Sequence, residues 1–296
     1  ETMSKKIFII VGDNLGLSRK QIDYDALEIV KFPVFVDGVE YRQSKQHNAK
    51  WLISKYEKEK VVAKSSTLIH NEIAEIIERN HANYDVFIHV VMSSGLSAAS
   101  FRVAENVRKQ FENIVPVINV DTRQSINGVG SVLLGIIDLI KTHPDLSVEE
   151  LAAACQQIVE NTFSWFVFPD LNYLYKGGRI GKAQSLMGSV LHIIPVVGMM
   201  GNEKDGLILA MGKGRTFRQV NDLIIEQIRA KMQEKSVNRI KRAITLSGYG
   251  DKNQDAYAAL LEKIKTLPVD DVVEGEGGLV DAVYCGPGAY GVSILL

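Results

Sequence analysis

Serine and threonine side chains gather in three short segments of the first half of the chain, at residues 65–67, 93–97 and 121–128. Hydroxyl groups donate hydrogen bonds without carrying charge, so they suit the recognition of an anion. A serine held in a turn between a strand and a helix is also a candidate nucleophile. The residue types therefore allow two kinds of chemistry, anion binding and acyl transfer.

Each serine segment follows a short apolar run and precedes a segment with helical periodicity. In a parallel sheet such turns share the edge at the carboxyl ends of the strands, where open α/β sheets bind ligands. Helix N-termini at that edge offer free N–H groups and partial positive charge. We expect an anion site made of hydroxyls and backbone amides, without a metal. Any one segment, taken alone, is more simply explained as a helix cap.

A serine hydrolase or esterase is the alternative, because Gly95-Leu96-Ser97 resembles a nucleophile elbow. Ser97 or Ser94 would be the nucleophile. A hydrolase also needs a histidine and an acid nearby, and the sequence establishes no such arrangement for its six histidines. His70 is the best candidate because it opens a helix beside the first serine segment, whereas His89 lies inside a predicted buried strand.

Two glycine patterns resemble nucleotide-binding motifs but lack the required context. Residues 286–291 fit G-x-G-x-x-G, yet only an apolar terminal strand follows where a helix is needed. Residues 201–206 have the glycine spacing of a phosphate loop, but Leu207 and Ile208 stand where Lys and Ser or Thr belong. We expect no nucleotide at either place.

Composition and charge limit the class of protein. The chain has 296 residues, of which 46% are hydrophobic and 23% charged, as in globular proteins. Its net charge of −1 gives no general attraction to nucleic acid. Cys155 and Cys285 lack a metal-ligand spacing, which favours buried thiols. Because we find no secretory signal and no segment long enough to span a membrane, we expect a cytoplasmic protein.

Alternating strands and helices predict an N-terminal α/β domain over residues 4–165, with a parallel sheet. Beyond it the pattern changes, which predicts a C-terminal α+β domain over residues 166–296 with an antiparallel sheet. The strands expected in this second domain are 165–168, 190–200, 207–211, 243–248 and 279–283, and its helices are 216–233 and 254–265.

Five blocks, in this order, resemble the DegV family: Ser65-Ser66, residues 93–97, Asp121-Thr122 with Gly128, residues 174–180, and Gly286-Pro287-Gly288. The most specific is Leu174-Tyr175-Lys176-Gly177-Gly178-Arg179-Ile180. The resemblance implies a parallel-sheet domain followed by an antiparallel-sheet domain, with a long-chain fatty acid in a tunnel between them. It also implies a non-catalytic protein without a cofactor, which presents the fatty acid to a separate fatty acid kinase subunit for phospholipid synthesis. Contact with a membrane would be transient at most, during lipid exchange.

The resemblance also assigns roles to residues. The fatty acid carboxylate would bind Ser65 and Ser94, with Ser97 close by. Tyr284 stands where the family has a histidine near the lipid head group, and a tyrosine donates a hydrogen bond but carries no positive charge. Arg179 and Arg215 are candidates to contact the head group or the kinase, although Arg179, which follows a glycine pair, is more simply explained by a salt bridge that holds its turn. The candidates for the tunnel lining are Ile126, Leu186, Met187 and Ile194, and each of them, taken alone, is more simply explained as ordinary core.

Overall fold

The computed structural model describes residues 4–188 and 192–296. Its strands are β1 Ile7–Gly12, β2 Leu27–Val30, β3 Val34–Val36, β4 Val39–Tyr41, β5 Ala63–Ser65, β6 Val86–Val91, β7 Val117–Asp121, β8 Thr162–Val167, β9 Ile194–Met200, β10 Leu209–Gly214, β11 Arg242–Ser247, β12 Val272–Glu276 and β13 Tyr290–Leu295. Its α-helices are α1 Ala49–Lys58, α2 His70–Asn80, α3 Ala98–Phe111, α4 Asn127–Thr142, α5 Val148–Glu160, α6 Asn172–Lys176, α7 Phe217–Glu234, α8 Gln254–Lys265 and α9 Leu279–Cys285. Single 3₁₀ segments run over Arg19–Gln21 and Gly181–Leu186.

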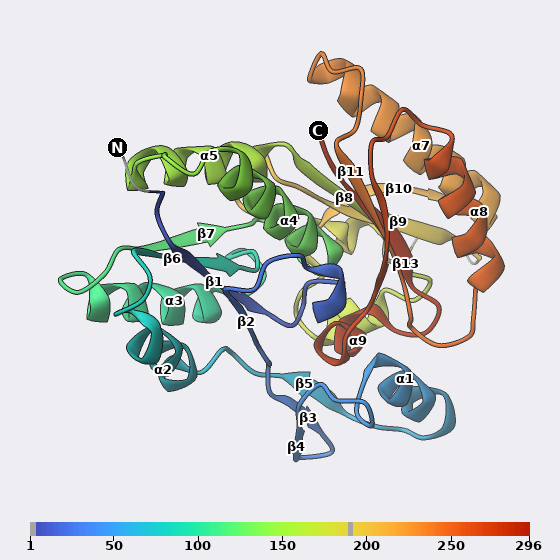
Figure 1. Cartoon of the computed structure of the whole chain (residues 1–296). Coiled ribbons are helices and arrows are strands. Elements are labelled where there is room, and N and C mark those ends of the chain that lie inside the picture. The colour runs from blue at the N-terminus through green and yellow to red at the C-terminus, as the bar shows by residue number, and fades with distance from the viewer. Residues whose placement is uncertain (1–3, 189–191) are drawn as a thin grey trace.

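The first sheet has the strand order β2-β1-β6-β7, and all its pairs are parallel. Helices α2 and α3 cover one face, and α4 and α5 cover the other (Figure 1). All six residues of β1 and of β6 are buried, as expected for strands covered on both sides. The predicted parallel N-terminal sheet is therefore confirmed.

The second sheet has the order β10-β9-β8-β13-β11-β12 and is antiparallel except for the pair β11–β12. Helices α7 and α8 pack on one face, while α4 packs on the other against β8, β11 and β13. Because α4 also contacts β6, it lies between the two sheets. Such a helix must be apolar nearly all round, which explains the buried run from Asn127 to Ile137. The predicted C-terminal antiparallel sheet is confirmed.

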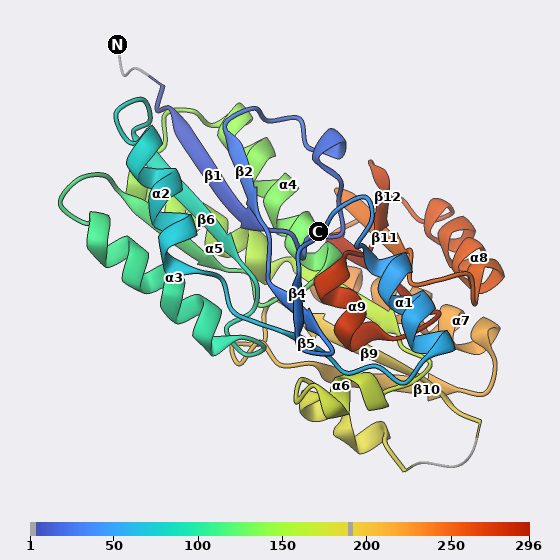
Figure 2. The same cartoon turned by 90° about the horizontal axis from the view of Figure 1, so that it is seen from below.

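A third, small sheet of order β4-β3-β5 lies below the other two in Figure 1, together with α1, and Figure 2 shows α1 beside α9. It is formed by the chain between β2 and α2. Helix α1 packs on α9, and β5 also contacts α9. This unit therefore brings the first serine segment, at the end of β5, against the last helix of the chain.

The predicted strand at residues 279–283 is wrong, because this segment is the first part of helix α9. All five residues are buried, so the run shows neither the alternation of a strand nor the periodicity of a surface helix. The helix is favoured locally by Asp281, which accepts a hydrogen bond from the N–H of Gly278 at 3.0 Å. Packing against α1, α6 and β5 then buries it on several sides.

The other predicted elements of the second half differ mainly in their ends. The strand expected at 190–200 begins at Ile194, and residues 190 and 191 lie outside the described residues. The predicted domain boundary near residue 165 falls inside β8, and α4 packs on both large sheets. The division into domains at 165 and 166 stays a prediction.

Within residues 4–188 and 192–296, no helix combines the length and the hydropathy needed to cross a lipid bilayer. The same residues contain no group of three or more histidine, cysteine, aspartate or glutamate side chains arranged to hold a metal ion.

Candidate functional site

A cavity of about 340 Å³ lies where the first sheet's carboxyl edge meets the second and third sheets. The loops after β1, β6 and β7 supply one wall, strands β8 and β9 supply another, and β5, α6 and α9 complete it. This volume falls within the usual range for small-molecule sites. Most of the lining side chains are apolar: Phe32, Met92, Leu96, Ala98, Ala99, Ile126, Phe166, Phe168, Leu174, Met199, Ile208 and Val280.

Polar groups of the lining gather where β5 meets α9. The hydroxyls of Ser65 and Tyr284 share a hydrogen bond. The guanidinium carbon of Arg179 lies 5.4 Å from the centroid of the Tyr284 ring, in a cation–π arrangement. Arg179 is held by hydrogen bonds to the carbonyls of Gly177, at 2.8 Å, and Leu96, at 3.3 Å. This arrangement places two hydroxyls and one positive charge at the same end of the cavity.

Gly177 explains why the Tyr284 ring can lie so close to the chain. A Cβ atom on Gly177 would lie 2.5 Å from Cε1 of Tyr284, which is closer than real contacts allow. The Gly177-Gly178 pair in the most specific sequence block therefore has a local structural role, since a side chain at residue 177 would displace the tyrosine ring from the cavity wall.

Ser97 lies beside this cluster as the N-cap of α3. Its hydroxyl accepts a hydrogen bond from the N–H of Ser100, at 3.3 Å, and donates one to the Ser100 hydroxyl, at 2.9 Å. The N–H of Leu68 also donates to that hydroxyl, at 3.4 Å, so the chain after β5 is tied to the start of α3. The N-terminus of a 14-residue helix thus faces the cavity and adds partial positive charge.

Ser94 makes a different set of contacts. Its N–H and its hydroxyl both donate to the carboxyl group of Asp121, at 3.1 and 2.5 Å. It is not among the residues that line the cavity. Its neighbour Ser93 is fully buried and donates to the carbonyl of Gly206, at 2.6 Å. The second serine segment therefore has three roles: Ser93 ties the two large sheets together, Ser94 is bonded to β7, and Ser97 lines the cavity.

A hydrolytic triad is not assembled around either serine. Among the described residues, neither Ser94 nor Ser97 forms a hydrogen bond with a histidine. The Nε2 atom of His70 is bonded to Gln110, at 2.7 Å. His89 is buried inside β6, and this burial lowers its pKa to about 4. Neither serine therefore has, among the described residues, the histidine partner that a Ser-His-Asp triad requires.

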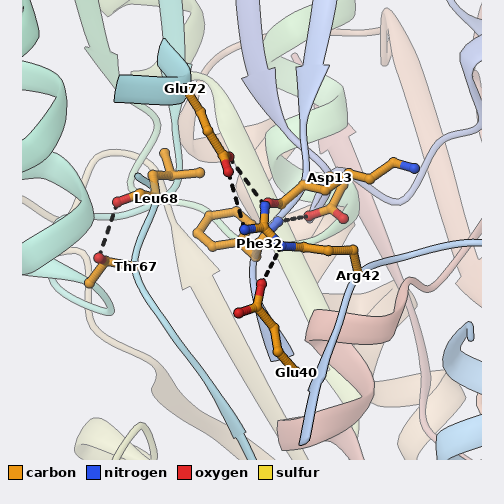
Figure 3. A network of polar contacts seen from close by, with 8 residues as sticks. Asp13, Phe32, Glu40, Arg42, Thr67, Leu68 and Glu72 are labelled. Carbon is orange, nitrogen blue, oxygen red and sulfur yellow. Dashed lines mark hydrogen bonds and ion pairs between the residues drawn. The ribbon is translucent and has the colours of Figure 1, made fainter. Parts of the chain in front are cut away.

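The wall near β1 is fixed by a separate polar network (Figure 3). The N–H of Phe32, whose ring lines the cavity, donates to Asp13 at 3.1 Å. Arg42 pairs with Glu40 and with Glu72, which joins the small sheet to the first turn of α2. Burial raises the pKa of Asp13 to about 7, although Lys31 and Arg42 oppose the shift.

A second hollow of about 650 Å³ adjoins the polar end of the cavity and shares Ser65, Arg179 and Tyr284 with it. Its other walls carry both charges and rings. The cationic residues are Lys60, Lys64 and Lys176, the acidic ones are Glu59 and Asp170, and the aromatic ones are Tyr56 and Tyr173. We call this second hollow the basic groove.

The sequence model of a protein family, described as uncharacterised protein of the DegV family, matches residues 6–296 of this chain. This chain belongs to the DegV family. A DegV domain-containing protein from Clostridium acetobutylicum is 26% identical over 98% of this chain and 99% of its own length. A DegV structure from Thermus thermophilus, described for fatty acid binding, has 26% identity and a TM-score of 0.87, over 98% of this chain and 99% of its own. A stearic acid-binding protein from Eubacterium ventriosum shares the fold, with a TM-score of 0.83 and 19% identity, over 99% of this chain and 98% of its own.

The structure brings five of the residues expected from the DegV resemblance into the lining of one cavity. These are Ser65, Ser97, Ile126, Arg179 and Tyr284. The lining also contains residues that the sequence did not single out as ligand contacts, above all Asn14 and Asp281. The sequence did contain a signal for Asp281, because it places an acidic residue inside the apolar run 279–283. Burial of a charged group is costly unless the group has a partner.

Five other DegV-based expectations lie away from the cavity, namely Ser94, Leu186, Met187, Ile194 and Arg215. Leu186 and Met187 line a separate pocket of about 300 Å³ with His192. Ile194 packs under α7, while Met199, on the same strand, faces the cavity. Alternation along β9 explains this, because residues separated by an odd number point to opposite faces. Arg215 follows β10 and is exposed.

Proposed function

We propose that this DegV protein binds a long-chain fatty acid in the cavity, with the carboxylate at the Ser65–Tyr284 hydrogen bond. The observation that carries the proposal is an apolar cavity whose polar end combines hydroxyls, the N-terminus of α3 and the positive charge of Arg179. The relative from Thermus thermophilus, described for fatty acid binding, supports it because this chain matches that structure over nearly its whole length.

The two ends of the ligand contribute differently. Burial of the tail gives about 0.8 kcal/mol for each methylene, so the apolar wall supplies most of the affinity. Hydrogen bonds from Ser65, Ser97 and Tyr284 to a carboxylate are charge-assisted and therefore stronger than neutral ones. They fix the orientation of the acid and offset the loss of hydration at its head group.

We further propose that the protein presents the carboxylate to a separate fatty acid kinase subunit in the cytoplasm. The basic groove supports this step because it shares Ser65, Arg179 and Tyr284 with the cavity. Lys60, Lys64 and Lys176 in the groove suit the phosphates of a nucleotide held by a kinase. Arg215, exposed after β10, remains a candidate contact for the same partner.

Fatty acid binding is tested by native mass spectrometry of protein purified from a bacterial host, followed by lipid extraction. We expect a species heavier than the polypeptide by the mass of one fatty acid. Delipidated protein should regain that mass after incubation with palmitate. Only the polypeptide mass, before and after incubation, would contradict the proposal.

The kinase step is tested by mixing the loaded protein with ATP and a purified bacterial fatty acid kinase catalytic subunit. We expect acyl phosphate to form with the loaded protein and not with palmitate alone. Lys64→Glu and Lys176→Glu should reduce turnover while palmitate binding persists. A fluorophosphonate probe tests the hydrolase alternative, and labelling that is lost in Ser97→Ala or Ser94→Ala would favour hydrolysis.

A further inference from the structure

The cavity wall contains a second pair of polar side chains, Asn14 and Asp281, besides the serine and tyrosine cluster. Asn14 follows β1 at the carboxyl edge of the first sheet, and Asp281 belongs to α9. Both are almost fully buried, with exposed fractions of 3% and 5%. Neither takes part in the contacts described above for the fatty acid carboxylate.

Asn14 has an unused hydrogen-bond donor. Its Nδ2 atom is shielded from solvent and has no hydrogen-bond partner among the described residues. Leaving such a group unpaired is destabilising, and most buried polar groups in folded proteins have a partner. A donor kept in the wall of a binding cavity is therefore best explained by an acceptor atom on the ligand.

Asp281 has an unused oxygen. Its Oδ2 atom accepts from the N–H of Gly278, at 3.0 Å, which accounts for its place in the first turn of α9. Within the described residues Oδ1 receives no hydrogen bond. Burial, together with the nearby Asp13, raises the pKa of Asp281 to about 8. Capping of the helix thus uses one oxygen and leaves the other for the cavity.

The surroundings of this pair are apolar. Val280 adjoins Asp281 in α9, and the ring of Phe32 also lines the cavity. A plain alkyl tail lying there would leave the Asn14 Nδ2 atom and the Oδ1 atom of Asp281 without a partner. A hydroxyl group suits both, because its oxygen can accept from the Asn14 amide N–H and from the protonated carboxyl group of Asp281.

We infer that Asn14 and Asp281 form a subsite for a hydroxyl group on the acyl chain, so that the preferred ligand is a hydroxylated fatty acid. This inference rests on the proposed function, because it assumes that the fatty acid occupies the cavity. Asp281 and Tyr284 are three positions apart on α9 and therefore lie on the same side of the helix, one turn from each other. With the carboxylate at Tyr284, the hydroxyl belongs to the part of the chain near the carboxyl end.

The test compares palmitate with two monohydroxylated derivatives, one with the hydroxyl near the carboxyl end and one with it near the methyl end. Titration of delipidated protein should show roughly tenfold tighter binding for the first derivative than for palmitate, as expected for one or two additional hydrogen bonds. The second derivative should bind no better than palmitate.

Asn14→Leu and Asp281→Leu should each abolish that preference, so that the first derivative and palmitate bind with about equal affinity. The readout is the ratio of the two affinities measured in the same variant, so a change in palmitate affinity itself does not enter it. Ser131→Ala is the matched control: Ser131 is buried, is bonded to Ser293 at 2.8 Å and does not line the cavity. It should retain the tenfold preference.

Palmitate binding with no preference for either hydroxylated acid would overturn the subsite and leave the proposed function intact. A preference that survives in Asn14→Leu and Asp281→Leu, or one confined to the hydroxyl near the methyl end, would also overturn it. If no acid binds at all, the proposed function fails together with the subsite.

Discussion

Ser65 and Tyr284 share a hydrogen bond between their hydroxyls although 219 positions separate them in the chain. The small sheet carries Ser65 on β5, and α9 carries Tyr284 near the last strand. Their contact closes the polar end of the cavity, and both residues also line the basic groove. A ligand that enters past this pair meets hydroxyl donors first and apolar side chains afterwards.

Removal of either hydroxyl should weaken fatty acid binding. We expect Ser65→Ala and Tyr284→Phe each to lose about 1–3 kcal/mol in binding free energy, the size of a hydrogen bond to a charged group. Ser94→Ala is the matched control, because its hydroxyl is bonded to Asp121 and is not part of the cavity lining. Titration with palmitate measures all three, and an equal loss in Ser94→Ala would contradict the assigned position of the carboxylate.

A methyl group at residue 177 should act through the Tyr284 ring. Gly177→Ala places a Cβ atom 2.5 Å from that ring, so the ring must move and binding should weaken about tenfold or more. In a Tyr284→Ala background the same substitution should have little further effect, since the clash is gone. A double-mutant cycle measures this coupling. Additive losses would show that residue 177 acts independently of the tyrosine.

Asp281 should make the delipidated protein less stable as pH rises from about 4 to about 8. Folded Asp281 keeps its proton up to a pKa of about 8, whereas the unfolded chain releases it near pH 3.9. In this window the folded state binds more protons, so the free energy of unfolding decreases with pH. Asp13, with a pKa raised to about 7, contributes with the same sign.

Urea unfolding at several pH values measures this slope, which should amount to a few kcal/mol across the window. Asp281→Asn cannot ionise at this position and should flatten most of the decrease. Substitution of an exposed acid, Asp145→Asn, should leave the slope unchanged. A slope that is the same in all three proteins would show that Asp281 does not keep its proton in the folded state.

The contact between the first sheet and the β9–β10 hairpin should contribute to stability. Ser93→Ala removes the hydrogen bond to the Gly206 carbonyl, whose donor is fully buried. We expect a loss of about 1–3 kcal/mol in the free energy of unfolding. Ser185→Ala, which removes an exposed hydroxyl bonded to Lys182 at 3.2 Å, should change it by less than about 0.5 kcal/mol. Equal effects in denaturant unfolding would contradict this role for Ser93.

Local sequence patterns predicted the two large sheets well, because each depends on short-range signals. Runs such as those of β1 and β6 are continuously apolar, and this is typical of strands covered on both faces. The turns after β6 and β7 were placed at the ligand-binding edge because the carboxyl ends of parallel strands share one edge of the sheet. The strand predicted at 279–283 was wrong, because a run that is buried on all sides has no periodicity to distinguish a helix from a strand.

By itself the sequence determined the fold class, the family and the presence of hydroxyl groups at one edge of a parallel sheet. Only the tertiary structure decided which of those hydroxyls face the cavity. Ser65 meets Tyr284 because the small sheet packs on α9, while Ser94 is bonded to Asp121 on the neighbouring strand. Asn14 and Asp281 likewise line the same cavity only in three dimensions. Long-range packing sets such contacts, and no local pattern of residue types encodes them.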